Sequence, residues 1–177
     1  MLPFDDATVQ HQNEDMRKPR FKRVPPKTGV QMRASMYEVL ELIYQFKALR
    51  SHHIAMHLPY RHSRGLSHSL RRLFDHGLID KVADLRQFNA LYQHDTYTLT
   101  AKGKDALVGR DLPPRYLFLE GGLEIKLSRE WDHSMMTIDL LSNVVAGATA
   151  RGVRVISAEE MFAQSARRPS SPFGSVK

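Results

Sequence analysis

The sequence predicts a mixed α+β fold, mostly helical, because three helical segments precede two short β-prone runs. Apolar residues recur near the 3.6-residue period over 35–50 and again over 66–77, which is typical of helices with one buried face. The pattern changes at 78–82 and 97–99, where β-prone residues predominate. A long helical pattern returns over 128–150. These observations predict one main domain with added elements at its C-terminal side.

The composition excludes several kinds of chemistry and favours a polyanionic partner. The 177 residues include no Cys, so disulfides, thiolate metal sites and cysteine nucleophiles are excluded. The N-terminus carries acids and no apolar stretch, and no apolar run reaches the length of about 18 residues that a membrane helix needs. We therefore expect a cytoplasmic protein without a membrane contact. The 26 Lys and Arg exceed the 19 Asp and Glu, giving a net charge of +7, which favours nucleic acid.

Four regions are expected along the chain: a basic N-terminal arm over 1–34, a domain over 35–110, an extension over 111–163 and a flexible tail over 164–177. Prolines and a run of basic residues in the arm argue against a packed structure. The arm is either a solvated linker or a segment that lies along DNA phosphates or in a minor groove. Its candidate contacts are Arg20, Lys22 and Arg23.

Three short helices followed by two strands is the order of a winged helix-turn-helix. The expected helices cover 35–50, capped by Ser35, 51–58, capped by Ser51, and 66–77, which ends at Gly77. On the third helix Leu66, Leu70, Leu73 and Phe74 form one apolar stripe. Its opposite side is expected to enter a major groove. The candidate DNA contacts there are Arg61, Arg64, Ser67, His68, Arg71 and Arg72.

Further contacts are expected from the wing and from histidines. Arg86, Gln87 and Asn89 lie where the tip of the wing should be. Residues 47–76 also hold six histidines, and a polyanion would favour their protonated form, so DNA binding should weaken as the pH rises through neutrality. Thr100 is expected to cap a helix that begins at Ala101.

The extension is expected to contain a hairpin, a helix and a short strand. Alternating apolar residues flank Gly121 and Gly122, which suggests the hairpin. A helix over 128–150 stops at Gly152, and residues 153–157 (VRVIS) suggest the strand. The helix is expected to contribute to the core, and residues around Trp131–Val145 are the candidate homodimer interface.

The runs GLIDKV and YTLTAKG resemble the wing and trailing helix of PadR- and MarR-type regulators. The wider arrangement over about 36–160, with LRSHHIAMHLPY, SLRRLFDHGLI and the 131–160 segment, resembles the plasmid replication-relaxation family. That resemblance implies a DNA-binding accessory of plasmid or mobile-element replication, relaxation or mobilisation, with a relaxase or replication initiator as a possible protein partner.

Two other functions stay open: a PadR- or MarR-like transcription regulator, and an adaptor that recruits a relaxase or replication initiator. Enzymatic activity is not expected. His53 and His57 have metal-ligand spacing but no nearby carboxylate in sequence. Asp132, His133 and Asp139 do not share one helix face well, and no Gly-Lys-Ser/Thr motif is present. No metal or cofactor is therefore expected.

Overall fold

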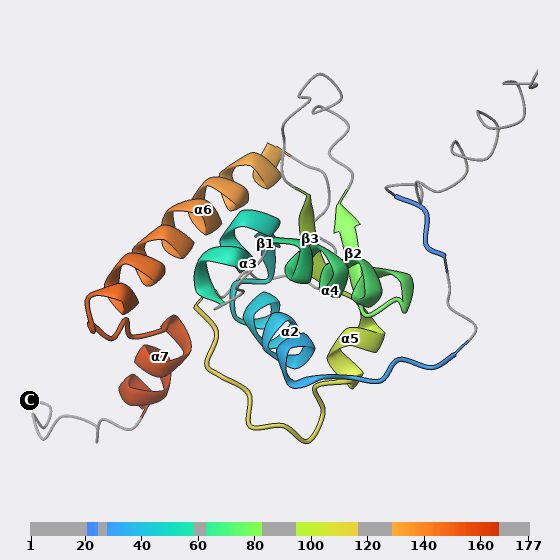
Figure 1. Cartoon of the computed structure of the whole chain (residues 1–177). Helices are drawn as coiled ribbons and strands as arrows, with labels where there is room; N and C mark the ends of the chain where they lie inside the picture. Colours follow the sequence, from blue (N-terminus) through green and yellow to red (C-terminus); the bar gives the residue numbers. More distant parts are fainter. Residues whose placement is uncertain (1–20, 25–27, 59–62, 83–94, 117–128, 167–177) are drawn as a thin grey trace, which may run out of the picture.

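The computed structural model describes residues 21–24, 28–58, 63–82, 95–116 and 129–166. Within them the chain is mixed α+β and mostly helical, with one small antiparallel sheet, as the sequence predicts. The elements are α2 (Ala34–Phe46), β1 (Ala48–Arg50), α3 (Ser51–His57), α4 (Ser63–Asp75), β2 (Ile79–Val82), β3 (Thr96–Leu99), α5 (Ala101–Asp105), α6 (Arg129–Ala150) and α7 (Ala158–Ala166) (Figure 1).

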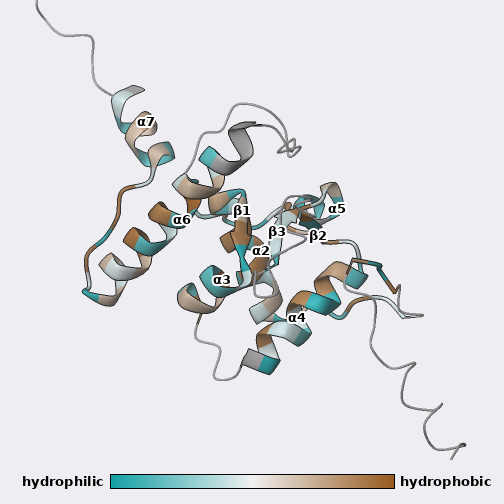
Figure 2. Ribbon diagram, turned by 90° about the horizontal axis from the view of Figure 1, so that it is seen from above, coloured by the Kyte–Doolittle hydropathy of each residue, from teal (hydrophilic) through white to brown (hydrophobic). Residues whose placement is uncertain are grey.

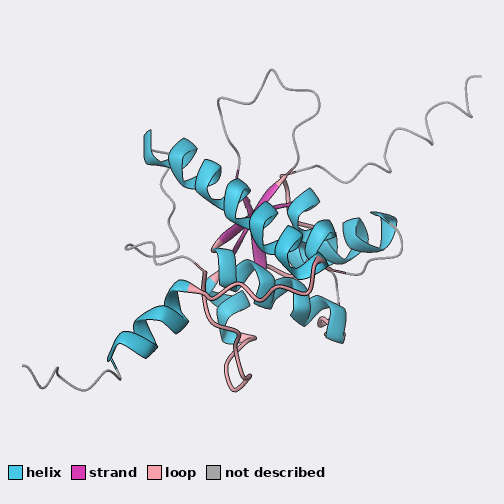
Figure 3. Ribbon diagram, turned by 90° about the vertical axis from the view of Figure 1, so that its left-hand side faces the viewer, coloured by secondary structure: helices cyan, strands magenta, loops and turns pink. Residues whose placement is uncertain are grey.

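The sheet has the order β1-β3-β2, with both outer strands antiparallel to β3. Leu49 pairs with Tyr97 on one side of β3, and Ile79 pairs with Leu99 on the other. Figure 3 shows the strands at the centre of the molecule with helices around them. The main core lies between the sheet, α2 and α4, and Val39, Ile43 and Phe46 of α2 are completely buried in it.

The first helix ends earlier than predicted, and a strand follows it. Lys47 has φ 67°, a positive value that residues of a right-handed helix do not adopt, so α2 ends after Phe46. Ala48–Arg50 then pairs with β3 instead of continuing the helix. The predicted caps are also wrong, because Arg33 precedes α2 and Arg50 precedes α3, both without a side-chain cap bond.

The junction between α4 and β2 is as the sequence predicts. Gly77 has φ +72°, the left-handed geometry that favours glycine after a helix. The Gly77 amide donates to the Phe74 carbonyl and the Leu78 amide to the Leu73 carbonyl, each at 2.9 Å. These bonds satisfy the last carbonyls of α4 and turn the chain directly into β2.

Helix α5 is capped as predicted and approaches β2 closely. The Thr100 hydroxyl accepts a hydrogen bond from the Gly103 amide at 3.0 Å, which confirms the predicted cap. The same hydroxyl contacts the carbonyls of Gly77 and Leu78. A β-carbon on Gly103 would overlap the Leu78 carbonyl oxygen, so this position requires glycine.

The C-terminal extension differs from the prediction in its last part. Helix α6 ends before Gly152, which has φ +69°, but residues 153–157 form no strand. Helix α7 (Ala158–Ala166) follows instead, mostly within the expected extension, and its last three residues lie in the region expected to be a flexible tail. Its start is a capping box, in which Ser157 Oγ accepts from the Glu160 amide and Glu160 Oε2 accepts from the Ser157 amide. The predicted hairpin around Gly121 and Gly122 lies outside the described residues.

Candidate nucleic-acid interface

Helix α4 buries the predicted apolar stripe and exposes part of its polar side. Leu66, Leu70, Leu73 and Phe74 are all in the core. Arg64, Ser67 and His68 are exposed on the N-terminal half of the helix. A helix that enters a groove uses such a surface: one face holds it to the domain, while residues near its N-terminus reach base edges. These three side chains therefore form the exposed polar face of α4.

Arg71 does not belong to this exposed face, although the helical period placed it on the side opposite the apolar stripe. Its Nε donates to Asp75 Oδ2 and its Nη2 lies by Asp75 Oδ1, both at 2.9 Å. Its Nη2 also donates to the Lys22 carbonyl at 3.0 Å. Asp75 is only 6% exposed and also accepts from the Val24 amide at 2.9 Å. Arg71 is thus held within the protein, and the prediction that its side chain faces outward for base contact is wrong for this conformation.

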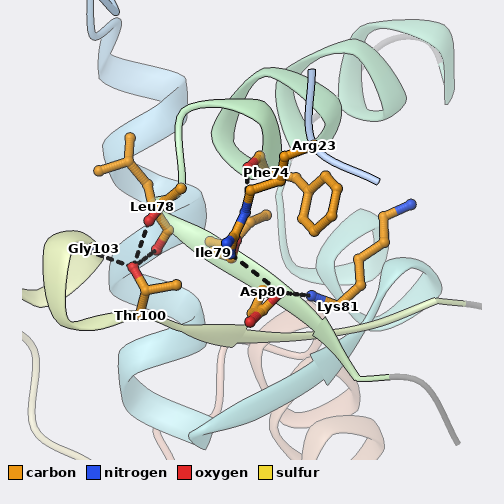
Figure 4. A network of polar contacts seen from close by, with 9 residues as sticks. Arg23, Phe74, Leu78, Ile79, Asp80, Lys81, Thr100 and Gly103 are labelled. Atoms are coloured by element: carbon orange, nitrogen blue, oxygen red, sulfur yellow. Dashed lines mark hydrogen bonds and ion pairs between the residues drawn. The ribbon is translucent and has the colours of Figure 1, made fainter. Parts of the chain in front are cut away.

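The arm segment (residues 21–24) packs on α4 and β2. Arg23 Nε donates to the Phe74 carbonyl at 3.1 Å, and its Nη2 lies 3.2 Å from Asp80 Oδ1 and 3.4 Å from the Ile79 carbonyl. Figure 4 shows the Arg23 side chain beside the Phe74 ring and directed toward β2, and its guanidinium carbon is 5.2 Å from the ring centroid. This part of the expected free arm is therefore docked.

A second group of cations lies at the C-terminal end of α4. The Lys102 ammonium donates to the His76 carbonyl at 2.9 Å. Burial, with Arg72 and Lys102 nearby, lowers the pKa of His76, although Asp75 acts in the opposite sense. Arg72 is half-buried. These cations lie at the end of the β2–β3 pair from which α5 leaves, away from the segment that joins the two strands.

An ion pair joins β2 to the residue just before β3, where the predicted wing begins. Lys81 Nζ lies 2.8 Å from Asp95 Oδ2, and the Tyr97 hydroxyl donates to the same oxygen at 3.3 Å. The pair brings together the residues on either side of segment 83–94. The predicted contacts Arg86, Gln87 and Asn89 lie in that segment, outside the described residues. Arg20 and Arg61, elsewhere in the chain, are also outside the described residues.

The histidines of α3 belong to the contact with α6 and not to the exposed face of α4. His53 is fully buried, with Nε2 3.4 Å from Asp139 Oδ1 on α6, and Arg50 Nη1 lies 2.9 Å from Asp139 Oδ2. His57 Nε2 lies 2.9 Å from the Ser142 hydroxyl. The expectation that the histidines of residues 47–76 contact DNA is therefore wrong for His53 and His57. In the described part of α4, only His68 keeps an exposed imidazole on the polar face.

Helix α6 has two apolar sides. Met135, Ile138 and Val145 are in the core, as expected. On the outer side Met136 is 70% exposed, Leu140 69% and Val144 51%, at a spacing of four residues that aligns them along the helix. Helices α6 and α7 lie on the other side of the molecule from α4 (Figures 1 and 2). For Trp131, which lies on α6, the structure describes the backbone but not the side chain.

No protein-family model, curated protein or solved structure matches this chain. The resemblance to the replication-relaxation family therefore stays a prediction. In the part of the chain that the structure describes, no helix combines the length and apolar character needed to cross a membrane. Within the same residues, His, Asp and Glu side chains form no group of three suited to a metal ion.

Proposed function

We propose that this chain is a non-enzymatic winged-helix protein that binds double-stranded DNA with the exposed polar face of α4 in the major groove. The observation that carries the proposal is the division of α4 between a buried apolar stripe and the exposed Arg64, Ser67 and His68. Arginine can donate two hydrogen bonds to guanine, and serine or histidine can reach phosphates or base edges.

The topology supports this proposal. Helices α2, α3 and α4 come before the strand pair β2–β3, which is the order given above for a winged helix-turn-helix, and β1 is an added strand. Segment 83–94 would then be the wing, and its basic side chains would contact the DNA backbone or the minor groove. The resemblance of the sequence favours a role in plasmid or mobile-element replication, relaxation or mobilisation, with transcription control as the alternative.

Selection from random duplexes, followed by fluorescence anisotropy, tests the proposal. The full chain should enrich a defined sequence, bind it in preference to unrelated duplex, and lose affinity as salt rises. A double variant, Arg64→Ala with His68→Ala, should lose most of the preference while keeping its fold. No enrichment by the wild type, or an unchanged preference in the double variant, would reject the assignment of α4.

The exposed apolar row on α6 favours a homodimer as the functional form. Met136, Leu140 and Val144 lie along a helix of 22 residues, which is about 33 Å long at 1.5 Å per residue. Monomeric proteins seldom leave a large contiguous apolar patch in water. Two copies of α6 packed across a two-fold axis would cover both rows with one self-complementary contact. The two α4 helices would remain free, because they lie on the other side of each subunit.

Light scattering at tens of micromolar, compared across variants, tests the homodimer. The wild type should have the mass of a dimer, and Leu140→Glu should have that of a monomer. Thr149→Glu is the matched control, because Thr149 is exposed on the same helix but lies half a turn away from Leu140. A monomeric wild type, or a dimeric Leu140→Glu variant, would exclude this interface. A relaxase or initiator bound at the same row would then be the alternative.

A further inference from the structure

Basic residues recur at every fourth position along one side of α4. This basic row consists of Arg64, His68, Arg72 and His76. Residues at this spacing lie one above the other on a helix, and the row turns by only about 40° per step. His76 directly follows α4 and continues its bonding, because its amide donates to the Arg72 carbonyl at 3.0 Å. Arg64 and His68 are exposed, and Arg72 and His76 are half-buried. The basic row therefore runs from the exposed polar face to the C-terminal end of α4.

Lys102 of α5 adds a cation at the C-terminal end of the basic row. It is exposed, and its ammonium donates to the His76 carbonyl at 2.9 Å. Helix α5 is held there, because the Thr100 hydroxyl donates to the Leu78 carbonyl and Gly103 approaches the same oxygen too closely for a β-carbon (Figure 4). An ammonium has three donors, so Lys102 keeps donors for an anion. Because it is already positioned, it loses less entropy when an anion binds.

The carboxylates of α4 and β2 have guanidinium partners outside the basic row. Asp75 Oδ1 lies 2.9 Å from Arg71 Nη2, and Asp80 Oδ1 lies 3.2 Å from Arg23 Nη2. Asp75 and Asp80 are the acids of these two elements. Among the described residues of α4 and β2, no further carboxylate is left to neutralise the row.

The electrostatic potential at the end of the basic row favours an anion. Burial lowers the pKa of His76, and the nearby charges of Arg72 and Lys102 lower it further, although Asp75 acts in the opposite sense. The part of this shift that the two cations cause reflects a positive potential, which stabilises negative charge. A neutral imidazole still has one N–H, which can donate to a phosphate oxygen.

We propose that Arg72, His76 and Lys102 form a phosphate-binding site, which holds the DNA backbone while Arg64 and His68 lie in the major groove. This inference rests on the proposed DNA-binding function and orients α4, which would lie along the groove instead of entering it by its N-terminus alone. From Arg64 to His76 the helix rises by about 18 Å. A duplex of that length offers about five phosphates on each strand, so both ends of the basic row can reach one site.

Lys102→Gln removes one charge from this site, and Lys104→Gln is its matched control. Both residues are exposed on α5, and each variant of the full chain loses one positive charge. Their side chains point about 200° apart at 100° per residue, so only Lys102 faces the end of the basic row. Arg72→Gln is a second variant of the site, and urea denaturation verifies that all three variants fold.

Fluorescence anisotropy gives the affinity of each protein for the selected duplex and for a scrambled duplex over a range of salt concentrations. Lys102→Gln and Arg72→Gln should bind both duplexes about two- to fivefold more weakly than the wild type. Their salt slopes should become shallower by about 0.9, the value for one lost phosphate contact. Lys104→Gln should keep the wild-type slope.

A second measurement replaces single backbone phosphates of the selected duplex by neutral methylphosphonates. One such replacement should weaken binding of the wild type and have little effect on Lys102→Gln, because that variant has already lost the contact. Wild-type salt slopes in both site variants, or equal losses in the wild type and Lys102→Gln at every replaced phosphate, overturn the inference. The proposed function then stands if the double variant of Arg64 and His68 still loses its preference. A wild type that binds no duplex overturns both.

Discussion

The Arg71 guanidinium meets the Asp75 carboxylate one turn further along α4 with two contacts of 2.9 Å. Unlike an ordinary surface pair, this one has a buried carboxylate, which also accepts the Val24 amide. Surface pairs contribute little to stability, but removing one partner of a buried pair leaves a charge without its counterpart. The first role of Arg71 is therefore to stabilise the folded state.

Arg71→Ala should lower the free energy of unfolding by about 1–3 kcal/mol, because it removes two charge-assisted hydrogen bonds from a buried carboxylate. Urea denaturation of the full chain, followed by circular dichroism, measures the change. Arg64→Ala should change stability by less than about 0.5 kcal/mol, as is usual for an exposed position. Equal stability of the wild type and Arg71→Ala would show that the pair does not hold in solution.

Arg64→Ala should weaken binding to the selected duplex by about 1–3 kcal/mol if Arg64 reads a base. Its fold should be retained, because the side chain is exposed. Anisotropy titrations with the selected and a scrambled duplex measure both affinity and preference. Arg33→Ala removes one exposed charge elsewhere and should affect the two duplexes alike. A uniform loss for Arg64→Ala as well would indicate a phosphate contact and not base recognition.

Periodicity predicted the apolar stripe of α4, but it could not reveal what covers the other side of the helix. Arg71 lies 140° from Leu66 on a helical wheel of 100° per residue, so the wheel makes it look exposed. The arm segment, about 50 residues earlier in the chain, covers that position. Long-range packing of this kind leaves no mark in the pattern of one helix.

The first strand was missed for a similar reason. Leu49 continues the apolar pattern of α2, and only its pairing with Tyr97 makes it part of a sheet. Helix α7 is different, because the sequence did contain its signal. Ser157 and Glu160 have the spacing of a capping box, and this spacing predicts a helix after Ser157.

His57 should make the fold less stable as the pH falls below neutrality. Burial lowers its pKa, although the contact with Ser142 opposes the shift. The unfolded chain therefore takes up a proton at about pH 6.5, where the folded chain still keeps the imidazole neutral. The unfolded state binds more protons in this range, so the free energy of unfolding decreases as the pH is lowered. The decrease ends once the pH is below the pKa of His57 in the folded state.

His57→Gln, which cannot titrate, should lose part of this pH dependence. Urea denaturation of both proteins between about pH 5.5 and 7.5, on either side of the ordinary histidine pKa, gives the two slopes. The glutamine amide can still approach Ser142, so the variant should fold. His76, whose pKa is also lowered, is expected to supply a part of the slope that remains. Equal slopes in the two proteins would contradict the assignment to His57.

Gly103→Ala should destabilise the fold, because the added β-carbon would overlap the Leu78 carbonyl oxygen. That carbonyl also accepts from the Thr100 amide at 3.2 Å, so it cannot move without disturbing the start of α5. Forcing an extra carbon into such a contact costs about 1–3 kcal/mol. Gly29→Ala is the matched control, because a β-carbon there meets nothing within 4 Å. Thermal unfolding of the two variants should lower the melting temperature for Gly103→Ala alone, and an equal effect in both would show that α5 does not pack against β2 in this way.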